Sequence, residues 1–218
     1  MKFEIKHRWS GAVLFSLETD RLKLCVEAAV KSGAHLRGAD LEAQDLGSAD
    51  LRGADLRDAD LRAAHLRGAY LGSADLRGAD LRDADLSDAD LGGADLSDAY
   101  LRGADLRAAD LGSAHLRGAD LRGAKLRTQD DQELTCVDNR PLLMLGPLGS
   151  RADTLYAWLT DRGVYVRAGC FFDTLEKFAA AVIQTHGDGV HAQEYRAAVA
   201  MIEAHARLWK PAAQEDKS

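Results

Sequence analysis

Residues 49–68 read ADLRGADLRDADLRAAHLRG, and this five-residue code decides the fold of the segment that contains them. A leucine occupies every fifth position from Leu36 to Leu126, nineteen leucines in all. An alanine stands two positions before each leucine, with Gln44 as the exception. The other three positions hold mostly polar or small residues, most often Asp before the leucine and Arg after it. The pattern predicts that the leucine and the alanine of each repeat are buried and that the other three positions face solvent.

A period of five excludes the ordinary secondary structures. On an α-helix, five residues turn by about 500°, so successive leucines would lie roughly 140° apart and spread around the whole surface. In a β-strand, side chains alternate between two faces, so leucines five residues apart would point to opposite faces. Neither structure buries the leucines together. A chain that bends once per repeat does so, which predicts a solenoid of stacked coils.

Tandem copies of A-[D/N]-L-x-x resemble the pentapeptide-repeat proteins, and the resemblance covers Ala34 to Thr128. It implies a mainly β fold, a right-handed quadrilateral β-helix with twenty residues per coil. By this resemblance, each leucine is the central inward residue, each preceding alanine is the second, and Gln44 is the single departure. Nineteen repeats make nearly five coils. At a strand spacing of ~4.8 Å, the rod is about 24 Å long.

The segment 1–33 is expected to cap the N-terminal end of this solenoid. Apolar residues alternate with other residues over 3–9 and over 13–17, with a Ser-Gly pair between them, which is typical of a β-hairpin. A short helix is expected to follow and to end at Gly33. Because the end coil of a solenoid exposes a strand edge, a cap of this kind prevents strand addition.

A C-terminal α+β domain is expected from 129 to 218, after a polar run that ends the repeats. Short apolar segments divided by turn residues predict an antiparallel meander, and two helices are expected after it. The expected strands are Leu134 to Val137, Leu142 to Leu145, Thr154 to Thr160 and Val164 to Arg167, and the expected helices run from Asp173 to about His186 and from about His191 to Trp209.

Composition argues against several classes of protein. The chain has no run of eighteen apolar residues and its first residues lack the apolar run of a signal peptide, so we expect no membrane contact and a cytoplasmic location. A net charge of −7 disfavours direct binding to nucleic acid. Cys25, Cys136 and Cys170 are odd in number and form no C-x-x-C, so we expect reduced packing residues.

The loop from His186 to His191 is the strongest candidate for chemistry, since two histidines and Asp188 surround a turn, with Glu194 on the next helix. The alternative is a loop with solvated histidines, which the lack of H-x-x-x-H or H-E-x-x-H spacing favours. A Cys170 nucleophile with His186 as its base is a second candidate, but the apolar neighbours of the cysteine predict a buried thiol. We therefore expect no catalytic residue, no metal site and no cofactor.

Six aspartates near the middle of the rod, here called the acidic belt, have no basic residue among them. They are either a partner-binding surface or a solvated surface that lacks local arginines, and the second interpretation is favoured. In most other repeats an Arg follows the Asp, and we expect Asp80→Asn, in such a repeat, to change little. The acidic belt consists of Asp83, Asp85, Asp88, Asp90, Asp95 and Asp98.

The sequence thus predicts a non-enzymatic protein-interaction or structural module, a rigid rod with a C-terminal domain that caps it or carries a partner site. The alternative rests on the resemblance, because the quinolone-resistance pentapeptide-repeat proteins are DNA mimics that occupy a type II topoisomerase. Duplex DNA carries one negative charge per ~1.7 Å, so a rod of about 24 Å that imitates it needs on the order of fourteen. Residues 35–128 carry a net charge of −5, so this alternative depends on the acidic belt.

The last helix is expected to carry an apolar stripe that something must cover. One hypothesis is a two-fold contact with a second subunit, which would make the protein a homodimer through its C-terminal domain. The other is packing on the preceding helix, through Leu175, Phe178, Ala179 and Val182. The stripe consists of Tyr195, Val199, Ile202, Ala206 and Trp209.

Overall fold

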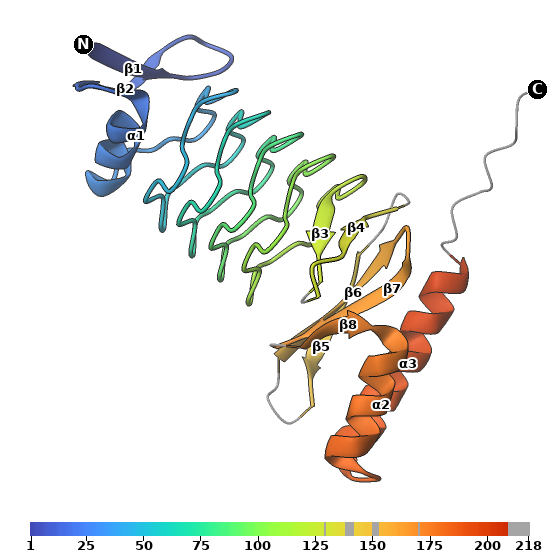
Figure 1. Cartoon of the computed structure of the whole chain (residues 1–218). Helices are drawn as coiled ribbons and strands as arrows, with labels where there is room; N and C mark the ends of the chain where they lie inside the picture. The colour runs from blue at the N-terminus through green and yellow to red at the C-terminus, as the bar shows by residue number, and fades with distance from the viewer. Residues whose placement is uncertain (129, 138–141, 150–152, 170, 209–218) are drawn as a thin grey trace, which may run out of the picture. The chain divides into compact units, whose positions relative to one another are not determined.

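The computed structural model describes residues 1–128, 130–137, 142–149, 153–169 and 171–208. The chain divides into two compact units, Met1–Leu126 and Arg127–Ser218 (Figure 1). The first unit holds the N-terminal cap and the repeats, and the second holds the C-terminal α+β region.

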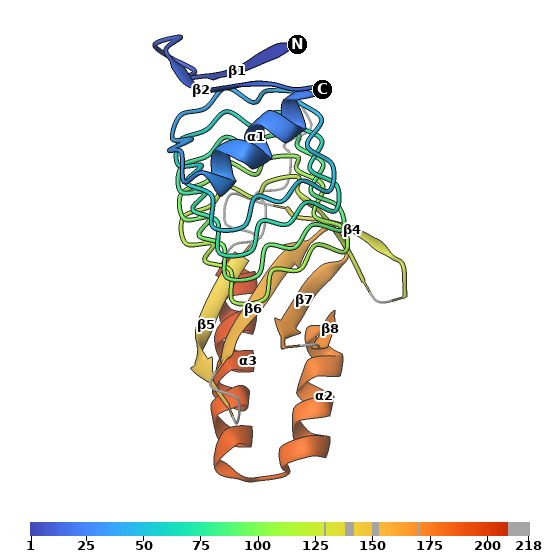
Figure 2. The same ribbon diagram turned by 90° about the vertical axis from the view of Figure 1, so that its left-hand side faces the viewer.

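The repeats form a coil that returns to the same side every twenty residues, and Figure 2 shows these coils stacked on one another. Single-residue parallel bridges join each coil to the next, for example between Asp50 and Tyr70. Next to that bridge, the Leu51 N–H donates to the Tyr70 carbonyl oxygen at 2.8 Å, and the Tyr70 N–H donates to the Ala49 carbonyl oxygen at 2.9 Å. Because the chain bends in every repeat, each ladder consists of isolated bridges rather than long strands.

The bend in each repeat is a β-turn that starts at the leucine. In one such turn, the Ala54 N–H donates to the Leu51 carbonyl oxygen at 3.1 Å. The third turn residue has a positive φ in every repeat from Gly38 to Gly123, and it is Ala, Ser or Asp where it is not Gly. A positive φ at this position alone is the mark of a type II turn. The turn therefore sets the five-residue period that the sequence displays.

The interior of the coil confirms the predicted inward pair. Every leucine from Leu36 to Leu126 is at most 5% exposed. The alanines two positions before them are buried too, except that Ala34 and Ala119 are half-buried, as is Gln44. Burial of one leucine stabilises the folded chain by roughly 1.5 to 3 kcal/mol, and stacking is what closes the core around each one.

A cap covers the first coil, and it has the predicted hairpin followed by one helix. The hairpin continues the backbone hydrogen bonding of the coil. The Asp40 N–H donates to the Lys6 carbonyl oxygen and the Arg8 N–H donates to the Gly38 carbonyl oxygen, both at 2.8 Å. These bonds occupy backbone groups that a free edge would leave open to strand addition. The cap consists of β1 (Lys2–Lys6), β2 (Val13–Glu18) and α1 (Leu22–Lys31).

Side chains of α1 satisfy further backbone groups on the same edge. The Lys23 Nζ donates to the Gly47 carbonyl oxygen at 2.6 Å, and the Glu27 carboxylate accepts from the Asp50 N–H at 3.0 Å. Between two coils, backbone groups of the preceding coil make the corresponding hydrogen bonds. The first coil has no preceding coil, and helix α1 supplies one side-chain donor and one side-chain acceptor in its place.

The C-terminal unit is α+β, as the sequence predicts, with a four-stranded antiparallel meander and two helices. The sequence missed its fourth strand, β8, because Phe171–Thr174 runs directly into the next helix. The helix expected from Asp173 therefore begins two residues later, at Leu175, where Thr174 caps it and accepts from the Lys177 N–H at 3.3 Å. The elements are β3 (Lys125–Arg127), β4 (Glu133–Thr135), β5 (Leu142–Leu148), β6 (Asp153–Thr160), β7 (Gly163–Ala168), β8 (Phe171–Thr174), α2 (Leu175–His186) and α3 (Val190–Leu208).

Helices α2 and α3 pack on one face of this sheet, α2 against β7 and β8 and α3 against β5 (Figure 1). The core between the layers joins sheet residues such as Leu155 and Val166 to Phe178 and Val182 of α2 and to Ile202 of α3. No helix in the described part of the chain is long and apolar enough to cross a membrane.

Candidate functional site

The surface of the coil is organised by pairs of Asp and Arg that flank each leucine. Asp80 and Arg82 show the geometry, with Nε donating to one carboxylate oxygen at 2.7 Å and Nη2 to the other at 2.6 Å. Side chains two residues apart meet because the leucine between them points inward. Within the described repeats, seven such pairs form, at Asp50, Asp55, Asp60, Asp75, Asp80, Asp105 and Asp120.

The paired guanidinium groups change the acidity of these carboxyls. The hydrogen bond from Arg52 lowers the pKa of Asp50 to about 2. The corresponding arginines lower the pKa of Asp55, Asp75 and Asp120 below the ordinary aspartate value. These carboxyls are therefore ionised at neutral pH and neutralised locally, so such repeats present little net charge.

In two repeats where histidine replaces the aspartate, the arginine pairs with the next coil instead. Arg67, whose repeat has His65 in the Asp position, donates from Nε to Asp88 at 3.2 Å. Arg37 makes the same contact with Asp58 at 3.0 Å. These pairs cannot be read from the sequence directly, because their members lie twenty-one residues apart and meet only through the stacking of coils.

Five members of the acidic belt lie in repeats whose arginine is replaced by Ser or Gly, and Asp83 ends the repeat before them. Asp85, Asp90 and Asp95 are half-buried and accept hydrogen bonds from the backbone N–H two residues later, at 3.0, 2.9 and 3.0 Å. Asp83, Asp88 and Asp98 are exposed and stand at the positive-φ position of their turns. The backbone therefore fixes the first three carboxylates, while the other three project from the turns.

Two members of the acidic belt are neutralised by the preceding coil. Arg67 pairs with Asp88, and Arg77 Nε lies 3.7 Å from Asp95 Oδ2. The belt has no basic residue within its own stretch of sequence, but arginines of the preceding coil lie beside two of its carboxylates. Within the described part of the chain, the other four members form no ion pair: Asp83, Asp85, Asp90 and Asp98.

Asp80 is not an ordinary surface residue, because it is buried and paired, which argues against the expectation that Asp80→Asn changes little. Asp60 and Asp80 are 4% and 5% exposed. Arg8, beyond the end of β1, places Nη2 3.3 Å from Asp60 and 3.9 Å from Asp80. Burial opposes ionisation of Asp60, but the Arg62 hydrogen bonds and the charge of Arg8 prevail and lower its pKa. The cap is thus held to the coil by charge as well as by backbone hydrogen bonds.

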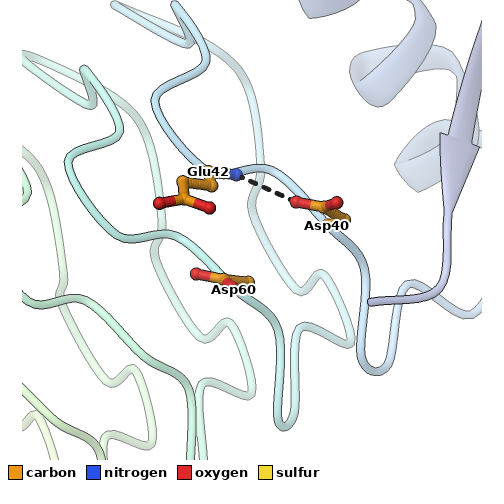
Figure 3. Close-up of side chains that lie close together, drawn as sticks. All are labelled: Asp40, Glu42 and Asp60. Atoms are coloured by element: carbon orange, nitrogen blue, oxygen red, sulfur yellow. Dashed lines mark hydrogen bonds between the residues drawn. The ribbon is translucent and has the colours of Figure 1, made fainter. Parts of the chain in front are cut away.

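Figure 3 shows Asp40, Glu42 and Asp60, whose carboxylate oxygens lie within 4.8 Å of one another. Such a cluster has the ligand type that hard cations prefer. However, Arg62 Nη2 donates to Glu42 and to Asp60, each at 2.8 Å. The guanidinium occupies the place of a cation, so the cluster is an ion-pair network of the coil surface.

The candidate chemistry of the C-terminal unit does not assemble into a site. The His186 and His191 rings lie 6.1 Å apart between centroids, and His191 Nδ1 lies 3.6 Å from Glu194. Among the described residues, these side chains form no group of three with metal-ligand spacing. Burial raises the pKa of the Cys136 thiol to about 12, and it also raises the pKa of Cys25. Cys170 lies outside the described residues.

The stripe considered for a dimer contact faces the interior of its own unit. Ile202 is 1% exposed, and Tyr195 and Val199 pack against the same core. The Tyr195 ring meets the Phe178 ring edge-on at 5.7 Å. These three residues follow the intramolecular alternative, while Trp209 lies outside the described residues.

Comparison with known proteins settles the family. The family model of pentapeptide repeats matches residues 32–62, 59–98 and 94–128, with eight copies. The chain belongs to the pentapeptide repeat protein family. Like other members, it is built around an A-D-L-x-x code; unlike many of them, it never places Phe at the central inward position.

Solved structures of other pentapeptide repeat proteins are similar to the repeat segment. HetL of the cyanobacterium Nostoc sp. strain PCC 7120, involved in heterocyst differentiation regulation, is 34% identical, with 42% of this chain and 52% of HetL covered and a TM-score of 0.32. A protein of the Arabidopsis thaliana thylakoid lumen is 35% identical over 42% of this chain and 69% of its own, with a TM-score of 0.27. A second Nostoc protein is 45% identical over 38% and 69%, with a TM-score of 0.29.

This chain therefore spans about half of the length of HetL. No match was found among curated proteins.

Proposed function

We propose that this pentapeptide repeat protein is a non-enzymatic protein-interaction module whose binding surface is the acidic belt. The observation that carries the proposal is the change of code in three consecutive repeats, where Ser87, Gly92 and Ser97 replace arginine. Everywhere else the coil neutralises most of its own carboxylates. Here it leaves Asp83, Asp85, Asp90 and Asp98 without an ion pair in the described structure.

The geometry of these carboxylates supports recognition of a basic protein surface. Asp85 and Asp90 are fixed by hydrogen bonds from Ser87 and Gly92, so binding costs little side-chain entropy. Their coil is rigid, because its backbone is hydrogen-bonded to a coil on each side. Charge complementarity of this kind speeds association and weakens with salt. We therefore expect a partner with exposed Lys and Arg, and a complex that is sensitive to ionic strength.

A non-enzymatic role agrees with the state of the reactive groups. The thiols of Cys25 and Cys136 are buried and their pKa values are raised, so they are poor nucleophiles. Most carboxyls of the coil are paired with arginines or accept hydrogen bonds from their own turns. General acid–base catalysis favours groups with a pKa near the working pH, whereas these paired carboxyls have lowered pKa values.

A topoisomerase that binds DNA is the second candidate partner, and the acidic belt is the observation that favours it. The ion pairs of Asp88 and Asp95 with Arg67 and Arg77 count against it, since they interrupt the row of negative charge. A DNA segment of similar length carries on the order of fourteen negative charges, far more than the four unpaired carboxylates of the belt. The belt is thus better suited to a compact basic patch than to a DNA-binding groove.

Affinity capture with the intact chain and a belt variant tests the proposal. In the variant, Asp83, Asp85, Asp90 and Asp98 are changed to Asn, which keeps the size of each side chain. A control matched in charge changes four exposed residues outside the belt to the corresponding amides, namely Glu18, Asp20, Asp45 and Glu176. We expect the wild type and the control to capture the same protein in low salt, and the belt variant to lose it at least tenfold. Equal capture by all three would refute the proposal.

A supercoiling assay separates the two candidate partners. Gyrase activity is measured with and without micromolar wild-type protein. Protection or inhibition that the belt variant lacks would assign a topoisomerase. No effect in this assay, together with belt-dependent capture of another protein, would assign the general interaction role.

A further inference from the structure

Each arginine on the coil surface lies between two positions where a carboxylate can stand. One is the residue two positions before it in its own repeat, and the other is the turn residue of the next coil, twenty-one positions after it. Within the repeats the turn residue is Asp in four places, and an arginine stands twenty-one positions before each of them. The four pairs are Arg37 and Asp58, Arg62 and Asp83, Arg67 and Asp88, and Arg77 and Asp98.

Two of these four arginines have a histidine two positions before them, and both reach the next coil. Arg37 donates from Nε to Asp58 at 3.0 Å. Arg67 donates from Nε to Asp88 at 3.2 Å, although Asp85 stands only three positions before Asp88 on the same coil. An arginine without an aspartate in its own repeat therefore pairs with the turn aspartate.

The other two arginines have an aspartate two positions before them, and both stay in their own repeat. Arg77 donates from Nε and Nη2 to Asp75, at 2.8 and 2.6 Å. Arg62 donates from the same two atoms to Asp60, each at 2.8 Å. Bidentate pairing of this kind fixes the plane of the guanidinium group as well as its position. The partner of each arginine thus follows from the residue two positions before it.

We propose that Asp60 and Asp75 are positioning residues of the acidic belt, because they hold two arginines that would otherwise neutralise it. The carboxylates kept open in this way are Asp83 and Asp98, which form no ion pair among the described residues. Asp88 is the belt member whose arginine is not held back, and it is paired. The inference rests on the proposed function of the belt, and it makes residues of the preceding coil responsible for how many belt carboxylates a partner can reach.

Asp75→His tests the rule for the arginines in the absence of a partner. Histidine fits this side of the coil, because His115 stands there two coils later, and at pH 8 an ordinary histidine is neutral. In a crystal structure of the variant, we expect Arg77 to donate to Asp98 at about 3 Å. An Arg77 that turns to Asp95 or to solvent instead would overturn the proposal.

His65→Asp is the converse change. It is expected to return Arg67 to its own repeat as a bidentate pair and to leave Asp88 without an ion pair. The crystal structure of this variant checks both parts. An Arg67 that still donates to Asp88 would show that the residue two positions before an arginine does not select its partner.

Binding of a fluorescent peptide of six arginines, at low salt, tests the consequence for the belt. Asp75→His is expected to weaken binding about threefold, as Asp98→Asn does, because each removes one open charge from the belt. The two changes together are expected to do no more than either alone. Asp55→His is the matched control, since it removes the same charge on the same side of the coil. The turn residue twenty-one positions after Arg57 is Gly78, so this control is expected to bind like the wild type.

The outcomes separate this inference from the proposed function. Weaker binding with Asp98→Asn but not with Asp75→His would overturn the inference alone. Equal weakening by Asp75→His and Asp55→His would overturn it too, because net charge would then explain both results. Unchanged binding with Asp98→Asn and with the belt variant would overturn the proposed function, and the inference with it.

Discussion

The repeat unit and the C-terminal unit bury their side chains in different ways. Each leucine of the coil has nearly the same surroundings as the leucine twenty residues away, because the coils repeat. Each core residue of the C-terminal unit has surroundings of its own: Phe178 meets Phe171 at 5.4 Å and Tyr195 at 5.7 Å. Residues in the same repeated surroundings are of the same type, so the sequence of the coil is periodic. The single core of the C-terminal unit mixes residue types, so its sequence has no period.

The surfaces differ in the same way. The coil covers itself with Asp–Arg pairs at fixed spacing, and departures from the code, such as the acidic belt, stand out against that background. The C-terminal unit has few such pairs among its described residues, and its unusual feature is an exposed apolar stripe on α3, which includes Val190, Met201 and Leu208. Unusual charge thus distinguishes the surface of one unit, and unusual apolar exposure distinguishes the surface of the other.

The largest effect is expected for Leu81→Asp in the coil. Leu81 is 0% exposed, and a carboxylate at this position would enter a dry stack of leucines. We expect a loss of at least about 5 kcal/mol and no cooperative unfolding of the repeats. Urea denaturation followed by hydrogen exchange of the repeat peptides measures it. Arg102→Gln, at an exposed position of the next coil, is the control and is expected to stay within about 0.5 kcal/mol of wild type.

Phe178→Ala is the corresponding change in the C-terminal unit. Phe178 is 4% exposed at the centre of the core between helices and sheet. We expect a loss of about 3 to 5 kcal/mol from that unit. If the two compact units unfold separately, exchange speeds up in α2, α3 and the meander while the repeat peptides keep their protection. Loss of protection in both units together would show that they form one cooperative structure.

Acid is expected to destabilise the repeat unit more than the C-terminal unit. Hydrogen bonds from arginine lower the folded pKa of Asp50, to about 2, and of Asp55, Asp75 and Asp120. Stability from a lowered pKa is complete above the unfolded value, about 3.9, and is lost as pH falls through the folded value. The urea midpoint of the repeats should therefore hold from pH 7 to 5 and fall between about pH 4 and 2.

Among the described residues of the C-terminal unit, the carboxyl with a lowered pKa is that of Asp173, which accepts a hydrogen bond from Lys177. That unit should lose less stability over the same range of pH. A control with Asp55, Asp75 and Asp120 changed to Asn should give a flatter profile below pH 4. Equal losses in both units, or a loss by the repeats between pH 7 and 5, would contradict the assignment to these carboxyls.

The smallest effect is expected for exchanges at the turn position. Ala63 is exposed with a φ of 52°, and Gly53 occupies the same position with a φ of 66°. A left-handed backbone costs a residue other than glycine roughly 1 kcal/mol, and the added freedom of unfolded glycine offsets part of that. Ala63→Gly should therefore raise stability by about 0.5 kcal/mol and Gly53→Ala should lower it by about 1 kcal/mol. Thermal unfolding measures both, and a gain from Gly53→Ala would contradict the type II turn.

The sequence predicted the coil because its period is the period of the structure. It predicted the cap and the C-terminal meander from alternation and turn residues, but it missed β8, since Phe171 to Thr174 joins a helix without a break. It also missed the pair of Arg67 with Asp88, because contacts between coils join residues twenty-one apart. The burial of Asp80 under Arg8 escaped it for the same reason.

The helix α3 shows a different limit of sequence reasoning. Two of its sides are apolar, and periodicity alone does not say which side meets the sheet. The stripe of Tyr195, Val199 and Ile202 was weighed as a contact with a second subunit, and it packs in the core instead. The stripe that includes Met201 is the one that stays exposed. Only the positions of α2 and the sheet distinguish the two.

Carboxyl footprinting tests the central claim most directly, namely that the acidic belt is the binding surface. The intact chain is labelled with a carbodiimide and an amine, alone and with its captured partner, and the labelled aspartates are quantified by mass spectrometry. The account predicts that the partner reduces labelling of Asp83, Asp85, Asp90 and Asp98 several-fold, while Glu18 and Glu176 label as before. Unchanged labelling of these four aspartates in a saturated complex would contradict it.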